Sequence, residues 1–241
     1  MSVLLEARSL SKDFRGLRAV ANVSFDVAEH GIVALIGPNG AGKTTVFNLI
    51  AGVFPSTGGE VVFAGRTLNG LRPDQVCGAG IGRTFQIVKP FPDLTVLENV
   101  MVGALHRTSS VSVAKVAAKR VLALLDMADR TYLPASSLTL PDRKRLEVAR
   151  ALATGPRLLL LDEVMAGLRP TETDRMVATL RKLRDDTGLT ILLIEHVMRA
   201  VMALSDKVVV LHHGEKIAEG TPSEVTRDPK VMESYLGEGA H

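Results

Sequence analysis

Residues 32–50 read IVALIGPNGAGKTTVFNLI: five apolar residues, a glycine-rich loop and a segment whose apolar side chains have helical spacing. The loop fits the pattern GxxxxGK[ST], and it follows a predicted strand and opens a predicted helix, the context in which this pattern binds phosphate. Glycines let consecutive backbone N–H groups point at phosphate oxygens, and the start of the helix adds its positive end. The candidate phosphate-binding residues are Gly37, Pro38, Asn39, Gly40, Ala41, Gly42, Lys43, Thr44 and Thr45.

Three side chains of this loop have separate expected tasks if the ligand is a nucleoside triphosphate. Lys43 would reach the β and γ phosphates, Thr44 would place its hydroxyl on Mg²⁺, and Thr45 would donate to the α phosphate. The alternative is a glycine-rich turn that binds nothing.

Composition limits the class of protein. The chain has 241 residues, 4% aromatic residues and no Trp, and its mean hydropathy is +0.20, which favours an aliphatic core of parallel strands buried on both faces. A net charge of +3 without a long block of like charges gives little support to a nucleic-acid partner. Cys77, the only cysteine, excludes an internal disulfide and a cysteine-rich metal site.

No apolar stretch approaches the ~20 residues that cross a bilayer, so a membrane role would require partner subunits. The first residues bring in the charges of Glu6 and Arg8 after a short apolar run, which is too brief for a signal peptide. We therefore expect a cytoplasmic location.

Hydrophobic periodicity predicts an α/β fold with a helical insert. Between about residues 91 and 155, Thr95 and Glu98 form a capping-box pattern, and the sequence becomes helical. Core segments are expected at 1–90 and 156–241, and the helical subdomain at about 91–155. The predicted strands are 3–7, 19–27, 32–36, 158–161, 190–194 and 208–211, with a turn at 212–215 and a capped helix from Thr221. One helix of the insert should bury an apolar face made of Val113, Val116, Ala117, Val121, Leu124 and Leu125.

Further candidate residues follow other predicted strands. Asp162 and Glu163 come directly after the run Leu158–Leu161, so Asp162 could hold Mg²⁺ through water and Glu163 could polarise the attacking water. His196 follows the strand 190–194 and could hydrogen-bond a γ phosphate as a neutral imidazole. The alternatives are a solvated turn for the carboxylates and a structural or surface role for the histidine.

Because ligands of parallel sheets bind beyond the carboxyl ends of the strands, Gly37, Asp162 and His196 should share one edge of the sheet. Phe14 precedes the second strand and could stack on adenine, with an apolar core position as the alternative.

Four motifs together resemble the nucleotide-binding subunits of ABC transporters. They are GPNGAGKTT at 37–45, RTFQ at 83–86, LLLLDE at 158–163 and LLIEH at 192–196. The resemblance covers essentially the whole chain and implies a P-loop NTPase (RecA-like) parallel-sheet core, an N-terminal antiparallel β subdomain and an inserted α-helical subdomain. It also implies ATP and Mg²⁺ as cofactors. Gln86 would contact the metal and water, and the residues from Ile87 to Phe91 would meet a membrane subunit.

Longer stretches resemble the ATPases of branched-chain amino acid importers. These stretches are IGRTFQIVKPFPDLTVLENV at 81–100, AGLRPTET at 166–173, GTPSEV at 220–225 and SYLGE at 234–238. This resemblance implies a paralogous ATPase subunit as dimer partner, two membrane permease subunits, an indirect binding-protein partner and a place at the cytoplasmic face of the membrane.

The chain departs from the family pattern at the signature, which usually reads LSGGQ and completes the nucleotide site of the partner subunit. Here the residues are Leu138, Thr139, Leu140, Pro141 and Asp142. Two smaller departures are Val164 after the carboxylate pair and Arg169 in the loop that follows. Because Pro141 suits the first turn of a helix, the segment could instead be only a helix start. If the signature is impaired, the two ATP sites of a dimer should be unequal.

Two other functions compete with transport. A cassette acting on a macromolecule is disfavoured by the absence of coiled-coil heptads and of a tandem copy. A P-loop kinase would need an arginine-rich lid, whereas the insert here is a helical lobe. Co-purification with hydrophobic subunits would separate transport from both, and phosphate release without an acceptor would exclude the kinase.

Overall fold

The computed structural model describes residues 2–85 and 90–236, which form two compact units. The first unit combines residues 1–76 with residues 190–241, and the second contains residues 77–189. We describe each unit by itself. In the described part of the chain, no helix is both long enough and apolar enough to span a bilayer.

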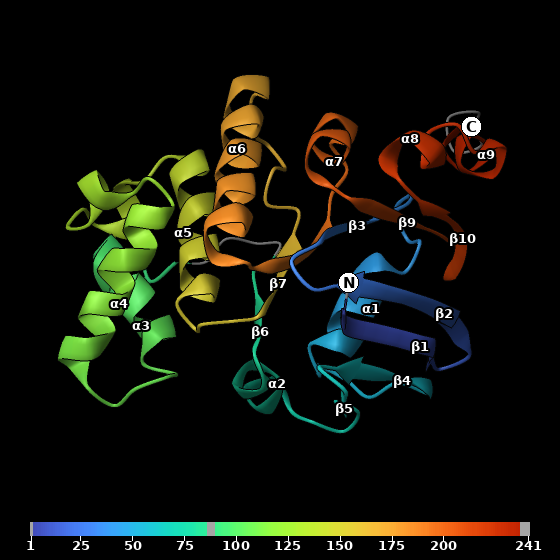
Figure 1. Ribbon diagram of the computed structural model, residues 1–241, viewed down its shortest axis with the longest axis horizontal. Coiled ribbons are helices and arrows are strands. Elements are labelled where there is room, and N and C mark those ends of the chain that lie inside the picture. Colours follow the sequence, from blue (N-terminus) through green and yellow to red (C-terminus); the bar gives the residue numbers. More distant parts are fainter. Residues whose placement is uncertain (1, 86–89, 237–241) are drawn as a thin grey trace. The chain divides into compact units, whose positions relative to one another are not determined.

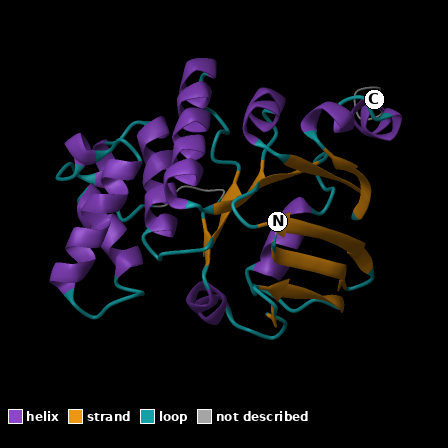
Figure 2. Cartoon of the chain, in the orientation of Figure 1, coloured by secondary structure: helices purple, strands orange, loops and turns teal. Residues whose placement is uncertain are grey.

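An antiparallel sheet forms the N-terminal part of the first unit (Figures 1 and 2). Its strand order is β2 (Leu17–Ala28), β1 (Val3–Phe14), β4 (Gly58–Phe63) and β5 (Arg66–Thr67). Apolar and polar residues alternate along β2, so one face of the strand is buried and the other is partly exposed to solvent. The strand predicted at 3–7 is confirmed, and β1 continues beyond it as one arm of a long hairpin.

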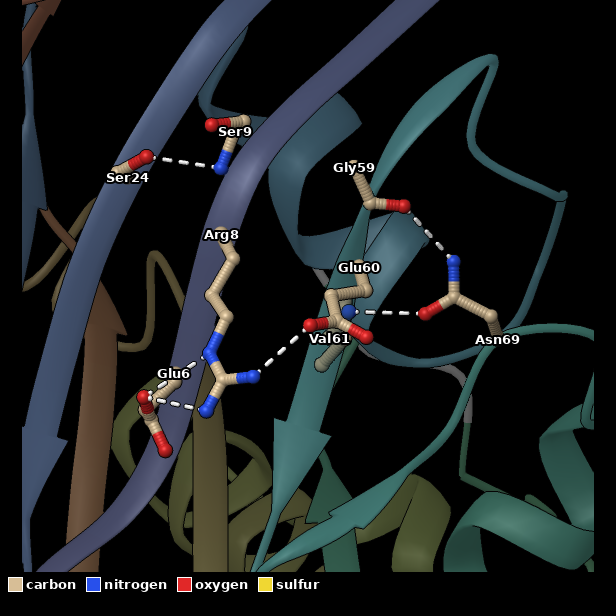
Figure 3. Close-up of polar contacts among 8 residues, drawn as sticks. All are labelled: Glu6, Arg8, Ser9, Ser24, Gly59, Glu60, Val61 and Asn69. Atoms are coloured by element: carbon tan, nitrogen blue, oxygen red, sulfur yellow. Dashed lines mark hydrogen bonds and ion pairs between the residues drawn. The ribbon is translucent and has the colours of Figure 1, made fainter.

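Polar side chains on this sheet join β1 to β4 (Figure 3). Arg8 lies between Glu6 and Glu60, with N–O distances of 3.0 and 2.8 Å. Asn69 accepts a hydrogen bond from the N–H of Val61 and donates one to the carbonyl of Gly59. The ion pair of Arg8 with Glu60 joins β1 to β4, the strand that follows the phosphate-loop segment in sequence, whereas Asn69 binds the backbone of β4.

A second, mainly parallel sheet positions the phosphate loop. In the first unit its strand order is β10 (Glu215–Gly220), β9 (Lys207–His212), β3 (Ile32–Ile36) and β8 (Thr190–Ile194). Strand β3 pairs in parallel with β8 and β9, and all five of its residues are buried. This is why its sequence is uniformly apolar rather than alternating.

The helices of the first unit are mostly short. They are α1 (Lys43–Ile50), α2 (Pro73–Ala79, which runs into the second unit), α7 (Met198–Leu204), α8 (Pro222–Val225) and α9 (Pro229–Leu236). The predicted cap at Thr221 is confirmed, because its side chain accepts the N–H of Glu224 and its own N–H is bound by the Glu224 carboxylate.

The second unit pairs two parallel strands and packs helices on one another (Figure 2). The strands are β6 (Ile81–Arg83) and β7 (Leu158–Asp162). The helices are α3 (Val96–Ala104), α4 (Val111–Leu124), α5 (Leu140–Leu152) and α6 (Pro170–Thr187), with short 3₁₀ turns at Ala128–Arg130 and Ala135–Ser137. The capping box of Thr95 and Glu98 is confirmed at the start of α3.

The predicted amphipathic helix is confirmed as α4, but its predicted buried face is only partly right. Val121 and Leu125 are buried as expected, whereas Val113 and Val116 are exposed, Val116 by 69%. Ala114, Ala118 and Leu122 are buried in α4 as well. Helix α4 contacts α3, and its buried residues combine small alanines with larger apolar side chains.

Candidate functional site

The phosphate loop has a backbone that only glycine accommodates at two points. Gly37 and Gly42 have positive φ angles of 146° and 97°. A Cβ atom would lie 2.0 Å from the carbonyl oxygen of Leu211 at Gly37 and 2.6 Å from that of Ala19 at Gly42. The loop is therefore enclosed by backbone on both sides, and any side chain at either position would displace it.

Helix α1 begins inside the motif without a side-chain cap. Its N-cap residue is Gly42, and the helix runs from Lys43. The first N–H groups of a helix have no partner within the helix, so a cap that supplies no side-chain acceptor leaves them available to an anion. This is the local reason why the sequence GPNGAGKTT can bind phosphate.

Lys43 folds back onto its own loop. Its Nζ donates to the carbonyls of Gly37 and Pro38 at 2.6 and 2.7 Å, and the residue is only 6% exposed. A buried ammonium makes strong, charge-assisted hydrogen bonds to phosphate oxygens. The side chain is thus already inside the loop that would receive the nucleotide.

The turn that contains Gly214, between β9 and β10, is hydrogen-bonded to the backbone of the phosphate loop. The N–H of Gly214 donates to the carbonyl of Ala41 at 3.1 Å, and the carbonyl of Gly214 accepts from Ala21 at 2.8 Å. Gly214 has a φ of 80°, and a Cβ there would lie 2.8 Å from the carbonyl oxygen of Ala19. Sequence reasoning missed this residue. The only signal was a glycine in the predicted turn at 212–215.

Phe14 lies at the end of β1 and is 40% exposed, which speaks against a core position. Its ring meets Phe54 edge-on with centroids 5.2 Å apart, and the Nζ of Lys12 lies 5.0 Å from its centroid. The ring is therefore held in one orientation by an aromatic neighbour and a cation.

His196 and the phosphate loop lie beyond the ends of neighbouring strands of one sheet. Leu35 of β3 pairs with Ile194 of β8 in parallel register, so both strands end at the same edge. Gly37 follows the first strand by one residue and His196 follows the second by two. His196 is exposed, whereas the preceding Glu195 is buried.

In the second unit, Asp162 is a buried carboxylate rather than part of a solvated turn. It is the last residue of β7, and its side chain is 2% exposed. Oδ2 lies 3.3 Å from a guanidinium nitrogen of Arg83, whereas Oδ1 has no hydrogen-bond partner within residues 2–85 and 90–236. Burial raises the pKa of the Asp162 carboxyl, and the positive charge of Arg83 opposes that rise.

An unsatisfied, buried carboxylate oxygen is a ligand that a hard cation such as Mg²⁺ or its bound water prefers. The described residues contain no group of three or more His, Cys, Asp or Glu that could form a complete metal cage. Mg²⁺ commonly takes one or two carboxylates and completes its shell with waters and substrate phosphates. Asp162 fits the role of such a single carboxylate ligand.

Glu163 continues directly from Asp162 with a backbone that non-glycine residues rarely adopt. Its φ is 50°, and its carbonyl accepts a hydrogen bond from Nζ of Lys144 at 2.8 Å. Such strain, of order 1–3 kcal/mol, tends to collect at functional sites. The conformation turns the chain sharply at the end of β7.

The segment in the signature position is built as a helix start. Thr139 is the N-cap of α5, and Pro141 stands in the first turn. The hydroxyl of Thr139 donates to Oδ2 of Asp142 at 2.9 Å, and Arg130 and Arg145 lie 3.0 and 3.6 Å from the same carboxylate. The negative charge of Asp142 is therefore already paired within its own unit.

Gln86 and residues 87–89 lie outside the described residues. The neighbouring Phe91 is partly exposed, with its N–H bound to Oδ1 of Asn99 at 2.9 Å. The guanidinium of Arg150 lies over its ring at 5.1 Å.

Family models match two parts of the chain. The model described as "ABC transporter" matches residues 20–166, more than half of the sequence, and thus includes the phosphate loop, Asp162 and Glu163. The chain belongs to the ABC transporter family. A second model, for the C-terminal part of branched-chain amino acid ATP-binding cassette transporters, matches residues 215–241.

Relatives of this ABC cassette match it over nearly its full length. The high-affinity branched-chain amino acid transport ATP-binding protein LivG of Salmonella typhimurium is 42% identical over 98% of both chains. The corresponding protein BraF of Pseudomonas aeruginosa is 39% identical over 98% of both. The crystal structure of the ADP conformation of MJ1267, an ATP-binding cassette of an ABC transporter, has a TM-score of 0.90 at 30% identity, with 98% of this chain and 100% of that chain covered.

These matches confirm the predicted family, the P-loop NTPase fold and the ATPase activity. The chain is the ATP-binding, ATP-hydrolysing subunit of a membrane-associated ABC transporter.

Proposed function

We propose that this ABC cassette powers the uptake of branched-chain amino acids from the cytoplasmic face of the membrane, bound to two permease subunits and paired with a paralogous ATPase. The match of residues 215–241 to the branched-chain amino acid model carries this proposal. This C-terminal match is needed to choose the substrate, because a transporter ATPase with a different substrate is also similar to the chain. The lipopolysaccharide export ATP-binding protein LptB of Escherichia coli is 35% identical over 97% of the chain. Likeness across the catalytic segments therefore does not select the substrate.

ATP binding is proposed to begin at the phosphate loop. The phosphates take the place of the Gly37 and Pro38 carbonyls as partners of Lys43, while the first N–H groups of α1 point at them. Phe14, held by Phe54, would stack on the adenine ring.

The metal and the attacking water are assigned to the remaining candidate residues. Thr44, Gln86 and Asp162 would hold Mg²⁺, which supplies positive charge to the β and γ phosphates. Glu163 would orient and polarise the attacking water, and His196 would donate a hydrogen bond to the γ phosphate. The strained turn at Glu163 and the unsatisfied oxygen of Asp162 support these roles.

A heterodimer is proposed because the signature of this chain lacks donors that the family pattern supplies. Pro141 has no N–H, and the Thr139 hydroxyl is engaged by Asp142. A partner with an unmodified signature would complete the phosphate loop of this chain. The site on the partner's own loop would be the weaker one.

The test is reconstitution. The chain would be co-expressed with the permease, ATPase and binding-protein genes that lie beside its own, and the complex placed in proteoliposomes with ATP inside the compartment that contains the cassettes. ATP-dependent accumulation of leucine, isoleucine or valine is expected. Accumulation of amides, urea or aromatic acids instead, with none of these three transported, would contradict the substrate assignment while leaving the ATPase role intact.

A further inference from the structure

Asp162 is tied to the end of β6 from two sides. Its carboxylate lies 3.3 Å from the guanidinium of Arg83, and its backbone N–H donates to the hydroxyl of Thr84 at 3.0 Å. The N–H of Thr84 in turn donates to the carbonyl of Leu160 at 2.9 Å. The last residue of β6 therefore holds the side chain of Asp162, and the residue that follows β6 holds its backbone.

The ion pair is buried but leaves the carboxylate incompletely satisfied. The side chain of Arg83 is 13% exposed and that of Asp162 only 2%. A buried carboxylate needs a counter-ion, and Arg83 provides one. Yet 3.3 Å is longer than the 2.7–2.9 Å usual for charge-assisted hydrogen bonds, and Oδ1 of Asp162 has no partner among the described residues.

This inference rests on the function proposed above, in which Asp162 helps to hold the Mg²⁺ of the nucleotide. We propose that Arg83 is a positioning residue that serves as the counter-ion of Asp162 in the metal-free chain, and that Mg²⁺ displaces it when nucleotide and metal bind. Arg83 sets how tightly the metal is held, because the energy of breaking its contact with Asp162 is subtracted from the metal's binding energy.

Electrostatics requires the displacement. A divalent cation bound at Asp162 stands within a few ångströms of the guanidinium, and two like charges so close in a poorly hydrated site repel strongly. Arg83 also has a second contact to retain, because its guanidinium carbon lies 5.8 Å from the ring centroid of Phe85, which is exposed. The face of an aromatic ring stabilises a cation that has left its carboxylate.

The opposing interpretation is that Arg83 only fastens β6 to β7. A purely structural tie would lower stability when removed, yet it would not change metal affinity separately from nucleotide affinity. The two measurements therefore have to be made on the same protein.

The experiment uses the full chain with ADP at pH 8, where protonation of the carboxyl competes least with the metal. Calorimetry in EDTA gives the ADP dissociation constant, and electron paramagnetic resonance of free Mn²⁺ gives the metal dissociation constant of the ADP complex. The variants are Arg83→Met, Arg83→Lys and the matched control Arg72→Met, which removes an exposed ion pair with Asp74.

Arg83→Met should bind ADP in EDTA within about twofold of the unmodified chain and bind Mn²⁺ about tenfold more tightly, since one nearby like charge is gone. Arg83→Lys keeps the charge and should stay near the unmodified value, as should Arg72→Met. Unchanged or weaker Mn²⁺ binding by Arg83→Met would overturn the inference.

If Arg83→Met does not fold, nitrogen-15 NMR of the arginine side chains in the unmodified chain replaces it. The Nε–Hε signal of Arg83 should shift when Mg²⁺ is added to the ADP complex and not when ADP is added in EDTA; a signal indifferent to Mg²⁺ overturns the inference. Failure of the unmodified chain to bind ADP under any condition would instead reject the proposed phosphate-loop function, and this inference with it.

Discussion

Lys43 provides the sharpest test at the scale of single residues. Replacing it by alanine removes the ammonium that lies inside the phosphate loop, where its Nζ binds the carbonyls of Gly37 and Pro38. Lys43→Ala should abolish ATP binding, as measured by calorimetry with the isolated chain. The control is Lys216→Ala, whose ammonium forms an ion pair with Glu219 on β10 of the same unit. Micromolar affinity surviving in Lys43→Ala would move the nucleotide site elsewhere.

Glu163 separates binding from hydrolysis. In Glu163→Gln the amide keeps the size of the side chain and its strained backbone position but cannot accept a proton, so ATP should bind with unchanged affinity. Turnover should fall at least ~10²-fold, the usual contribution of a general base or water-positioning group. Phosphate release by the assembled transporter measures this. Normal turnover would assign the catalytic role to another group.

The charge of Asp162 is expected to lower the stability of the folded chain while it is required for metal binding. Burial raises the pKa of this carboxyl, so the folded chain binds the proton more tightly than the unfolded chain does, and stability is lost as the pH rises through the folded pKa. Asp162→Asn mimics the protonated form. At pH 8 and without nucleotide it should therefore melt at a higher temperature than the unmodified chain, while Mg²⁺ no longer increases its ATP affinity. A lower melting temperature would show that Arg83 more than offsets the burial cost.

At the scale of elements, the segment that leads into α3 is the candidate contact with the permease. The backbone N–H of Phe91 donates to Asn99, and the guanidinium of Arg150 lies over its ring. The side chain nevertheless remains exposed to solvent. Phe91→Ala should leave nucleotide affinity intact and reduce co-purification with the permease or transport. Tyr132→Ala, which removes another exposed ring of the second unit, is the control. Parallel losses of nucleotide affinity and transport would contradict a coupling role.

Local requirements explain which elements could be predicted from the sequence. The phosphate loop was predictable because positive φ angles and close backbone approaches at Gly37 and Gly42 demand glycine at fixed spacing. Strand β7 was predictable because a run of leucines ends in two carboxylates. The inward face of α4 was predicted only in part: Val121 is buried as expected, but the choice of valine over alanine at the start of the helix failed, because Ala114 is buried and Val113 is exposed.

Long-range register explains what could not be predicted. The contact of Gly214 with Ala41 depends on how β9 and β10 are placed beside β3, and the pairing of Arg83 with Asp162 depends on the alignment of β6 with β7. Gly214 stands in a predicted turn and Arg83 in the motif RTFQ, but neither context reveals which residue is the partner.

At the scale of the whole assembly, the helix-start geometry of α5 predicts two unequal ATP sites. One missing charge-assisted hydrogen bond is worth roughly 1.5–3 kcal/mol, or about one to two decades in rate if it acts in the transition state. Glu163→Gln should therefore remove most of the ATPase activity of the heterodimer, and the matching substitution in the paralogue should remove less.

Introducing both Pro141→Gly and Asp142→Gln into this chain should make the two glutamate substitutions more equal in the ATPase activity that they remove. Equal losses from the two glutamate substitutions, or a fast ATPase formed by this chain alone, would show that Pro141 serves only to start the helix.

The turn at Gly214 has a consequence for how the protein is made. The loop at 37–45 emerges early from the ribosome, but the carbonyl of Leu211 and the N–H of Gly214 that enclose it are synthesised only after most of the chain. Strands β8 and β9, which flank β3, are also late. A nascent chain that stops short of residue 211 therefore lacks the backbone that encloses its own phosphate loop, and we expect such an unfinished copy of the subunit to bind ATP weakly.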